Sequence, residues 1–227
     1  MGSSMSRPDT TRSLATVSGP RFSSLDESLI EGLDYLISVR GTFPISGLTG
    51  YWDNVWPWYV NGTISYLNMP GTIGSDLLQS GLSIDSEYYI NEGIKTADSY
   101  HVPAFSSGGQ LESARPYAND VLILFQAWEA TGTQSYLDLA EDLALRTVAE
   151  YTGAEYADKM IDNRYSMAGW DAAAYIYAWY VTGAAAENST LTGWAHDMTD
   201  QMLYRFDDWD HVCVGTSTWA YDWSALS

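Results

Sequence analysis

The sequence is poor in the residues and patterns that most often indicate a specific function. Its single cysteine, Cys213, leaves no partner for an intramolecular disulfide and rules out a cysteine-based metal cluster. No apolar run reaches the length of a membrane span. A phosphate-binding glycine loop, an HExxH zinc motif and a Ser-His-Asp pattern are also missing. We therefore predict no metal site, no cofactor and no membrane partner.

Positive charge is scarce as well. Ten Lys and Arg residues stand against 29 Asp and Glu, which gives a formal net charge of −19, and the lysines are Lys95 and Lys159 alone. Such a surface repels nucleic acid and anionic membranes, so neither is predicted as a partner. A neutral or cationic partner fits better, as does a salty medium that screens the self-repulsion. The composition resembles that of proteins from halophilic archaea.

The first 22 residues differ in composition from the rest, being rich in Ser, Thr and Arg. We predict a flexible segment there and one helical-hairpin repeat domain over residues 23–227. Residues 11–19 resemble the twin-arginine secretion signals of haloarchaea, although one arginine and the apolar core of such signals are missing. The resemblance favours an extracellular or cell-surface location and leaves a cytoplasmic one open.

Apolar residues recur at helical spacing along most of the domain. A helical run rich in aromatics is expected over 54–69, where Pro70-Gly71 breaks it before a short helix to residue 80. The other expected helices span 24–40, 85–100, 117–131, 134–151, 169–182 and about 189–205, and a further one starts at Trp219. The helices at 117–131 and 169–182 are apolar on nearly every side, which indicates burial.

A period near 51 residues runs through these helices. A shift of Asp171 by 51 residues in either direction reaches Asp120 and Asp222, and Thr131-Gly132 reaches Thr182-Gly183 in the same way. A fixed period of this length is typical of a repeat architecture. Because helix direction alternates, the tight turns fall at one end of the array. The long loops fall at the other end, at 41–53, 101–116, 152–168 and 206–218.

The hairpin sequence from Ala127 to Glu141, AWEATGTQSYLDLAE, resembles the inner-to-outer helix turn of six-hairpin glycosidases. The resemblance implies an all-α fold, an (α/α) toroid of helical hairpins. A toroid of six hairpins needs about twelve helices, whereas this sequence supplies seven or eight. The array is thus expected to be incomplete, either a fragment lacking C-terminal hairpins or a partial toroid that needs a partner such as a second copy. Its last inner helix should expose apolar surface.

Asp120, Asp171 and Asp222 fall at the first turns of successive inner helices, and glycosidases of the resembled family place their acid and base carboxylates near this rim. Glycoside hydrolysis needs two carboxylates about 5–10 Å apart. Inner helices packed about 8–10 Å apart can supply that spacing. The competing interpretation is that each Asp caps free N–H groups at its helix start, and recurrence at every repeat favours it. Asp171, flanked by Trp170, is the best catalytic candidate.

Substrate-binding candidates come from the same loop-rich end. Aromatic rings stack on sugars, and nearby polar groups bind hydroxyls. An arginine at a rim can bind an acidic sugar in bidentate fashion. The candidates are Trp52, Asp53, Trp170, His101, Arg115, Tyr117 and Arg164. The alternatives are that the rings fill the core and that the arginines form ion pairs. Residues 207–211 carry three acids and a histidine, and we interpret them as a solvated loop rather than a Ca²⁺ site.

These features favour a carbohydrate-active enzyme, such as a glycoside hydrolase, that acts on a glycan by acid/base chemistry. The alternative is a non-catalytic glycan-binding or scaffold protein, in which the repeated aspartates only cap helices. A terpenoid-cyclase-like protein is a third option, disfavoured by the absence of a DxDD or DDxxD motif. The fold does not choose among them, because toroids host many activities.

Overall fold

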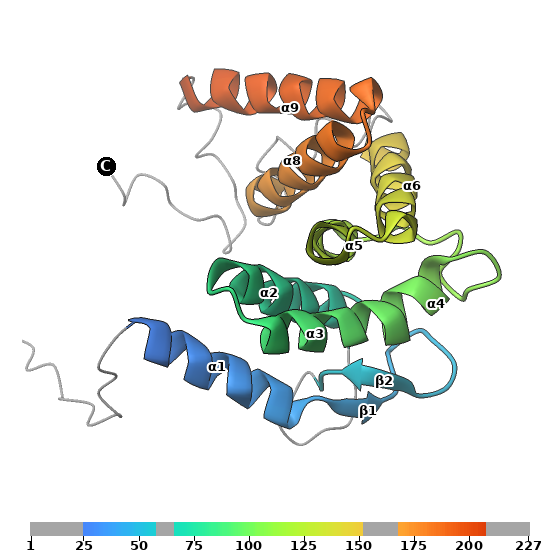
Figure 1. Ribbon diagram of the computed structural model, residues 1–227. Coiled ribbons are helices and arrows are strands. Elements are labelled where there is room, and N and C mark those ends of the chain that lie inside the picture. Colours follow the sequence, from blue (N-terminus) through green and yellow to red (C-terminus); the bar gives the residue numbers. More distant parts are fainter. Residues whose placement is uncertain (1–24, 58–65, 152–167, 208–227) are drawn as a thin grey trace, which may run out of the picture.

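The computed structural model describes residues 25–57, 66–151 and 168–207 (Figure 1). Almost all the described elements are helical, so the all-α class is confirmed. In chain order they are α1 (Leu25–Val39), β1 (Gly41–Phe43), β2 (Trp52–Val55), α2 (Met69–Ser83), α3 (Glu87–Thr96), the π-helix η1 (Ala97–His101), α4 (Val102–Phe105), α5 (Ala118–Thr131), α6 (Gln134–Tyr151), α8 (Ala168–Ala185) and α9 (Ser189–Asp207).

The helices of the second half of the chain match their predicted boundaries closely. Helix α6 spans the residues expected of it, and α5 and α9 lie within two residues of theirs. Gly132 separates α5 from α6 with φ of +67°, a left-handed conformation that a glycine adopts without steric cost. The predicted start of a helix at Trp219 lies outside the described residues.

The first half departs from the prediction at the loop over 41–53 and the helical run over 54–69. Strands β1 and β2 pair as an antiparallel hairpin, so part of the expected loop is sheet, and Asn54 belongs to β2. Helix α2 begins at Met69 and carries Pro70 in its first turn. A proline costs little there because the first N–H groups of a helix have no partner inside it, so Pro70-Gly71 opens a helix instead of breaking one.

The long loop expected from His101 is shorter than predicted. The helix of α3 continues through η1 into α4 and ends at Phe105. Pro103 lies in the first turn of α4 and has no N–H to donate to the helix. The π-helical turn η1 ends directly before α4. The backbone hydrogen bonds of this turn span five residues instead of four, and the chain stays helical through the proline. His101 is therefore held on a helix, not on a loop.

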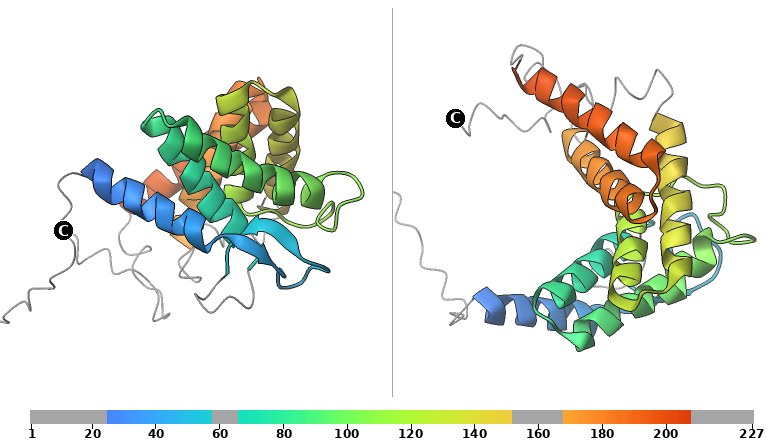
Figure 2. Two further views of the ribbon diagram at one scale, coloured as in Figure 1. Left: turned by 60° about the horizontal axis from the view of Figure 1, so that its bottom comes forward. Right: turned by 45° about the horizontal axis from the view of Figure 1, so that its top comes forward.

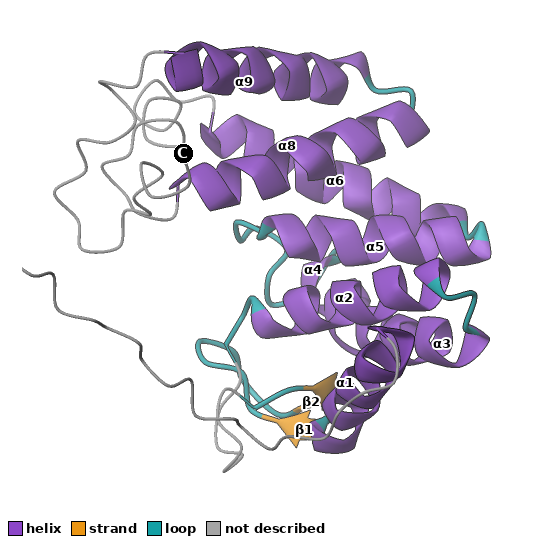
Figure 3. Cartoon of the chain, turned by 90° about the vertical axis from the view of Figure 1, so that its left-hand side faces the viewer, coloured by secondary structure: helices purple, strands orange, loops and turns teal. Residues whose placement is uncertain are grey.

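Three helical hairpins, α2–α3, α5–α6 and α8–α9, make up most of the molecule. Their tight connections lie at one edge, as predicted (Figure 3). Helix α5 lies between α2 and α8 and contacts both. From α1 to α9 the helices follow an arc, seen in the right-hand view of Figure 2. No described helix is both long enough and apolar enough to cross a membrane.

The main core is built around α5. Every residue from Asp120 to Ala127 is buried, as expected of an inner helix. A smaller cluster of Leu33, Trp56, Leu77 and Tyr89 joins α1 to the α2–α3 hairpin. The prediction of a helix buried on nearly every side is wrong for α8, where Tyr177 and Tyr180 are about half exposed. On that side Tyr180 meets the His196 ring of α9 edge-on at 5.9 Å between centroids, and both tyrosines stay half open to solvent.

Candidate functional site

Two of the predicted site residues, His101 and Asp120, contact each other in the core. His101 Nε2 lies 3.1 Å from Asp120 Oδ1, with 0% and 1% of the two side chains exposed. The pair joins the end of η1 to the first turn of α5. A buried polar pair of this kind is stable only because each partner satisfies the other.

Asp120 also acts as a helix cap. Its Oδ2 accepts a hydrogen bond of 2.8 Å from the backbone N–H of Tyr117, the residue before α5. The first turn of α2 packs closely against it, since a Cβ added at Gly71 would lie 2.6 Å from Asp120 Oδ1. Glycine at position 71 therefore lets two inner helices approach at the carboxylate.

Aromatic rings surround His101. Phe105 stacks on the imidazole at 6.2 Å between ring centroids, and Tyr100 meets it edge-on at 4.8 Å. Burial, with a smaller contribution from the charge of Asp120, raises the pKa of the Tyr100 hydroxyl well above its ordinary value. That hydroxyl donates a hydrogen bond to the carbonyl of Leu67 at 3.2 Å. The pair thus lies in a buried, aromatic environment.

Trp52, a predicted stacking platform, reaches this cluster from β2. Its ring meets Tyr100 edge-on at 5.4 Å between centroids, so it packs partly into the core. Within the described part of the chain, Trp52 Nε1 and His101 Nδ1 are both buried without a hydrogen-bond partner. The structure thus brings together Trp52, His101 and Asp120, although as a packed cluster rather than an open rim.

The geometry of Asp120 supports the capping interpretation. Both carboxylate oxygens are engaged and the side chain is buried, so a sugar has no access to it. Trp170 and Asp171 lie in the first turn of α8, and the structure describes their backbone only. Arg164 and Asp222 lie outside the described residues. The spacing between the three predicted catalytic aspartates therefore stays a prediction.

The remaining candidates are exposed, as a binding role requires. Asp53 accepts a hydrogen bond from the Thr42 hydroxyl at 2.6 Å, across the two-stranded sheet. The Arg115 guanidinium lies over the Tyr175 ring at 5.9 Å from its centroid, next to the exposed Tyr117. Arg115 and Tyr117 thus mark the junction between the start of α5 and α8, whereas Asp53 belongs to the β-hairpin.

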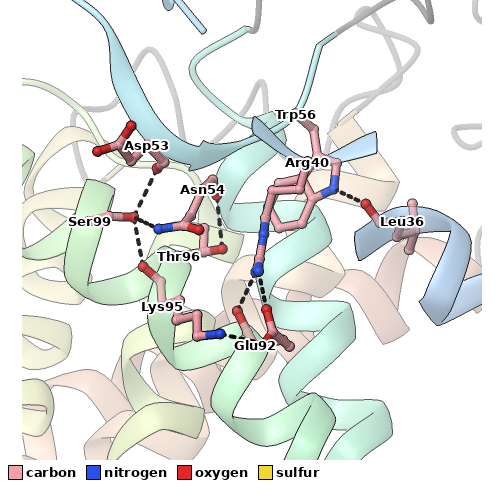
Figure 4. A network of polar contacts seen from close by, with 9 residues as sticks. All are labelled: Leu36, Arg40, Asp53, Asn54, Trp56, Glu92, Lys95, Thr96 and Ser99. Atoms are coloured by element: carbon pink, nitrogen blue, oxygen red, sulfur yellow. Dashed lines mark hydrogen bonds and ion pairs between the residues drawn. The ribbon is translucent and has the colours of Figure 1, made fainter. Parts of the chain in front are cut away.

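A second polar network, shown in Figure 4, was not predicted from the sequence. The Arg40 guanidinium lies over the Trp56 ring and donates to Glu92, both to its backbone carbonyl at 2.7 Å and to its carboxylate. Lys95 donates to the other oxygen of that carboxylate. Burial on its own raises the pKa of Glu92, but the hydrogen bonds from Lys95 and Arg40 outweigh it and hold the pKa below its ordinary value.

The same network fastens β2 to α3. Thr96 Oγ1 donates to the Asn54 carbonyl at 3.0 Å, and Asn54 Nδ2 lies 3.2 Å from Ser99 Oγ. Asn54 has φ of +56°, a left-handed conformation in which asparagine is tolerated better than most residues. Every group of this network is engaged by another part of the protein, so we assign it a structural role. The scarcity of basic residues is the one sequence signal that could have drawn attention to Arg40 and Lys95.

A groove of about 610 Å³ lies between α6 and the loop that follows α4. It is lined by Phe105, Ser106, Ser107, Glu112, Ser113, Ser135, Asp138, Leu139, Asp142 and Arg146. Arg146 holds its wall in place by pairing with Asp142 and donating to the carbonyls of Glu112 and Phe105. Asp138 and Asp142 lie on the polar side of the amphipathic helix α6, where no sequence pattern predicted a groove.

The groove is rich in hydroxyl and carboxylate groups, which bind polyols by accepting and donating hydrogen bonds. A metal site is a poorer match, because no three His, Cys, Asp or Glu side chains within the described residues are placed to share an ion. The loop at its rim also contacts the β-hairpin, since Gln110 exchanges hydrogen bonds with Thr49. The loop that lines the groove is therefore tied both to α6 and to the β-hairpin.

Comparison with known proteins does not assign a family. No protein-family model matches the chain, and no curated protein or solved structure matches it either. The toroid resemblance thus depends on the hairpin sequence and on the repeat alone.

Proposed function

We propose that this protein binds a carbohydrate and that the groove along α6 takes part in recognition. The main support for this proposal is the groove, which has a volume of about 610 Å³ and is lined by four serines, three carboxylates and one arginine. Sugars present dense hydroxyl groups to such donors and acceptors. A net charge of −19 also suits a neutral ligand better than an anionic one.

The scaffold we propose is a partial (α/α) toroid. Its support is the order α2, α5, α8 of neighbouring inner helices, each the first member of a hairpin, and the common edge of the tight turns (Figure 3). In this proposal Asp120 is a cap and not a catalyst, because its oxygens bind Tyr117 N–H and His101. We also propose that the protein is secreted or attached to the cell surface, where it would encounter glycans.

A glycan array tests recognition directly. Ser135 lies in the groove wall on the first turn of α6, so Ser135→Trp should fill the groove and abolish array binding. Ser189→Trp is the matched control, because Ser189 occupies the first turn of α9, is exposed, and is no part of the groove. Equal binding by both variants and the wild type would remove the groove from the proposal. Absence of binding by the wild type to any glycan would remove the function.

Hydrolysis of a glycan is the second candidate, favoured by one observation. Asp171 occupies the first turn of α8, an inner helix next to α5, at the edge opposite the tight turns where the long loops are expected. We expect Asp171→Asn to abolish any hydrolysis of a glycan that the wild type binds, while array binding persists. Hydrolysis that survives this substitution would exclude Asp171 from the mechanism.

A further inference from the structure

Helix α8 exposes a strip of apolar and aromatic side chains. Ala173, Tyr177, Tyr180 and Ala184 are all exposed, with 50% of Tyr177 and 49% of Tyr180 accessible. Their spacing of four, three and four residues places them on one face of the helix. No charged residue occurs from Ala172 to Ala186. In so acidic a protein, an uncharged exposed helix face indicates a surface that another element covers.

The opposite face of α8 is fully used. Tyr175 donates to the carbonyl of Pro116 at 3.2 Å, next to α5, and Trp179 Nε1 donates to Thr147 Oγ1 of α6 at 2.7 Å. Gly183 packs against Leu191 of α9. Helix α8 is thus held by α5, α6 and α9. The strip lies at the border of this contact, where Tyr180 meets the His196 ring of α9 edge-on at 5.9 Å between centroids and stays half exposed.

The order of the inner helices indicates what covers the strip. Helices α2, α5 and α8 begin at residues 69, 118 and 168, at intervals of 49 and 50 residues, and each contacts the one before it. The same interval leads to residue 218. Helix α9 runs from the tight-turn edge back to the edge where α8 begins (Figure 3), and twenty residues of sequence follow it.

The sequence of these last residues fits the strip. In helical spacing, Trp219, Trp223 and Leu226 share one apolar face, and Asp222 is the single charged residue from 218 to 227. We propose that residues 218–227 pack along Ala173, Tyr177 and Tyr180 as the next inner helix. Since α2, α5 and α8 all begin at the same edge, the new helix would run parallel to α8. The 51-residue period that relates Asp120, Asp171 and Asp222 then places Ser224 at the level of Ala173.

Cross-linking of the full chain tests this register. In a Cys213→Ser background, Ala173→Cys with Ser224→Cys should form an intramolecular cross-link with a short bis-maleimide. Ala184→Cys with Ser224→Cys is the matched control, because Ala184 lies on the same strip but eleven residues, about 16 Å, farther along α8. Equal cross-linking of both pairs, or none in either, would overturn the proposal. Cross-linked dimers would show that a second copy covers the strip instead.

Hydrogen exchange supplies a second measurement that does not depend on cysteine variants. If the proposal is right, Trp223→Ala should raise the exchange rates of amides 173–184 at least several-fold while those of α5 stay unchanged. Unchanged exchange in α8, in a variant that keeps the helical content of the wild type, would contradict it.

Discussion

Helices α5 and α8 have the same kind of sequence and different surroundings. Both are apolar on nearly every side. Helix α5 contacts α2 on one side and α8 on the other, and its residues from Asp120 to Ala127 are all buried. Helix α8 contacts α5, α6 and α9, yet Tyr177 and Tyr180 stay half exposed, although Tyr180 meets the His196 ring of α9 edge-on.

The difference shows what hydrophobic periodicity measures. A helix that is apolar all round is suited to burial on every side, yet burial itself depends on elements far away in the chain. Helix α5 is buried in part by α2, which packs so closely that a Cβ at position 71 would clash with Asp120. In α8 only about half of the apolar surface is buried by described helices. The contrast can be tested by changing each helix in turn.

The largest effect is expected from emptying part of the α5 core. Leu124 is fully buried, so Leu124→Ala should lower the free energy of unfolding by about 2–5 kcal/mol. Tyr180→Ala in α8 should cost less than Leu124→Ala but more than the roughly 0.5 kcal/mol of an ordinary surface site, because residues 218–227 are proposed to cover Tyr180. Urea unfolding of each variant measures both.

Tyr88→Ala provides the exposed reference for this pair, because 53% of Tyr88 is accessible on α3. A loss for Tyr180→Ala that clearly exceeds that of Tyr88→Ala would show that α8 is covered in solution, as the docking of residues 218–227 requires. A loss for Leu124→Ala as small as that of Tyr180→Ala would break the comparison, because the two helices would then be equally exposed.

A smaller effect is expected from separating α2 and α5. A Cβ at position 71 would lie 2.6 Å from Asp120 Oδ1 and 3.0 Å from its backbone nitrogen, so the helices must move apart. Gly71→Ala should therefore destabilise the protein by about 1–3 kcal/mol, measured by urea unfolding. Gly32→Ala in α1 is the control, because an added Cβ there meets nothing within 4 Å. It should be neutral or stabilising, and an equal loss at both sites would contradict the close approach.

The helices of the second half were predictable because local signals agree with each other there. Thr131-Gly132-Thr133 marks a helix end and a helix start, and the amphipathic pattern of α6 has the period of a helix throughout. The helices of the first half were harder to predict because a proline either breaks a helix or lies in its first turn. Pro70 and Pro103 each lie in the first turn of a helix, where the same residue that breaks a helix interior is tolerated.

The candidate site was predictable in part. Spacing placed Asp120 at a helix start, and the structure confirms it as a cap. Its contact with His101 joins residues 19 positions apart in the chain, through a π-helical turn that no local pattern indicated. The groove depends on Arg146 binding backbone carbonyls of a loop more than thirty residues away. Contacts of this range are set by packing and leave no periodic trace in the sequence.

The smallest expected effect is the loss of stability in acid that follows from protonation of Glu92, which lies on α3. Because hydrogen bonds hold the pKa of Glu92 below its ordinary value in the folded protein, Glu92 binds its proton more readily once unfolded. The contribution of Glu92 to stability is therefore fully present above its unfolded pKa of about 4.3. It is lost as the pH falls through the lower folded pKa. The loss should be modest, because Lys95 is half exposed and screened by water.

Urea unfolding at a series of pH values tests this with Glu92→Gln. The stability gap between wild type and Glu92→Gln should be widest near neutral pH and should close in acid, while Glu129→Gln, at an exposed position of α5, shows no such closure. Hydrogen exchange in acid should then rise first where Arg40 and β2 meet α3, before it rises in α8. A gap that stays constant with pH would mean that Glu92 is not ionised in its pair. An earlier rise in α8 would mean that its one-sided packing, rather than this ion pair, is the first contact to fail.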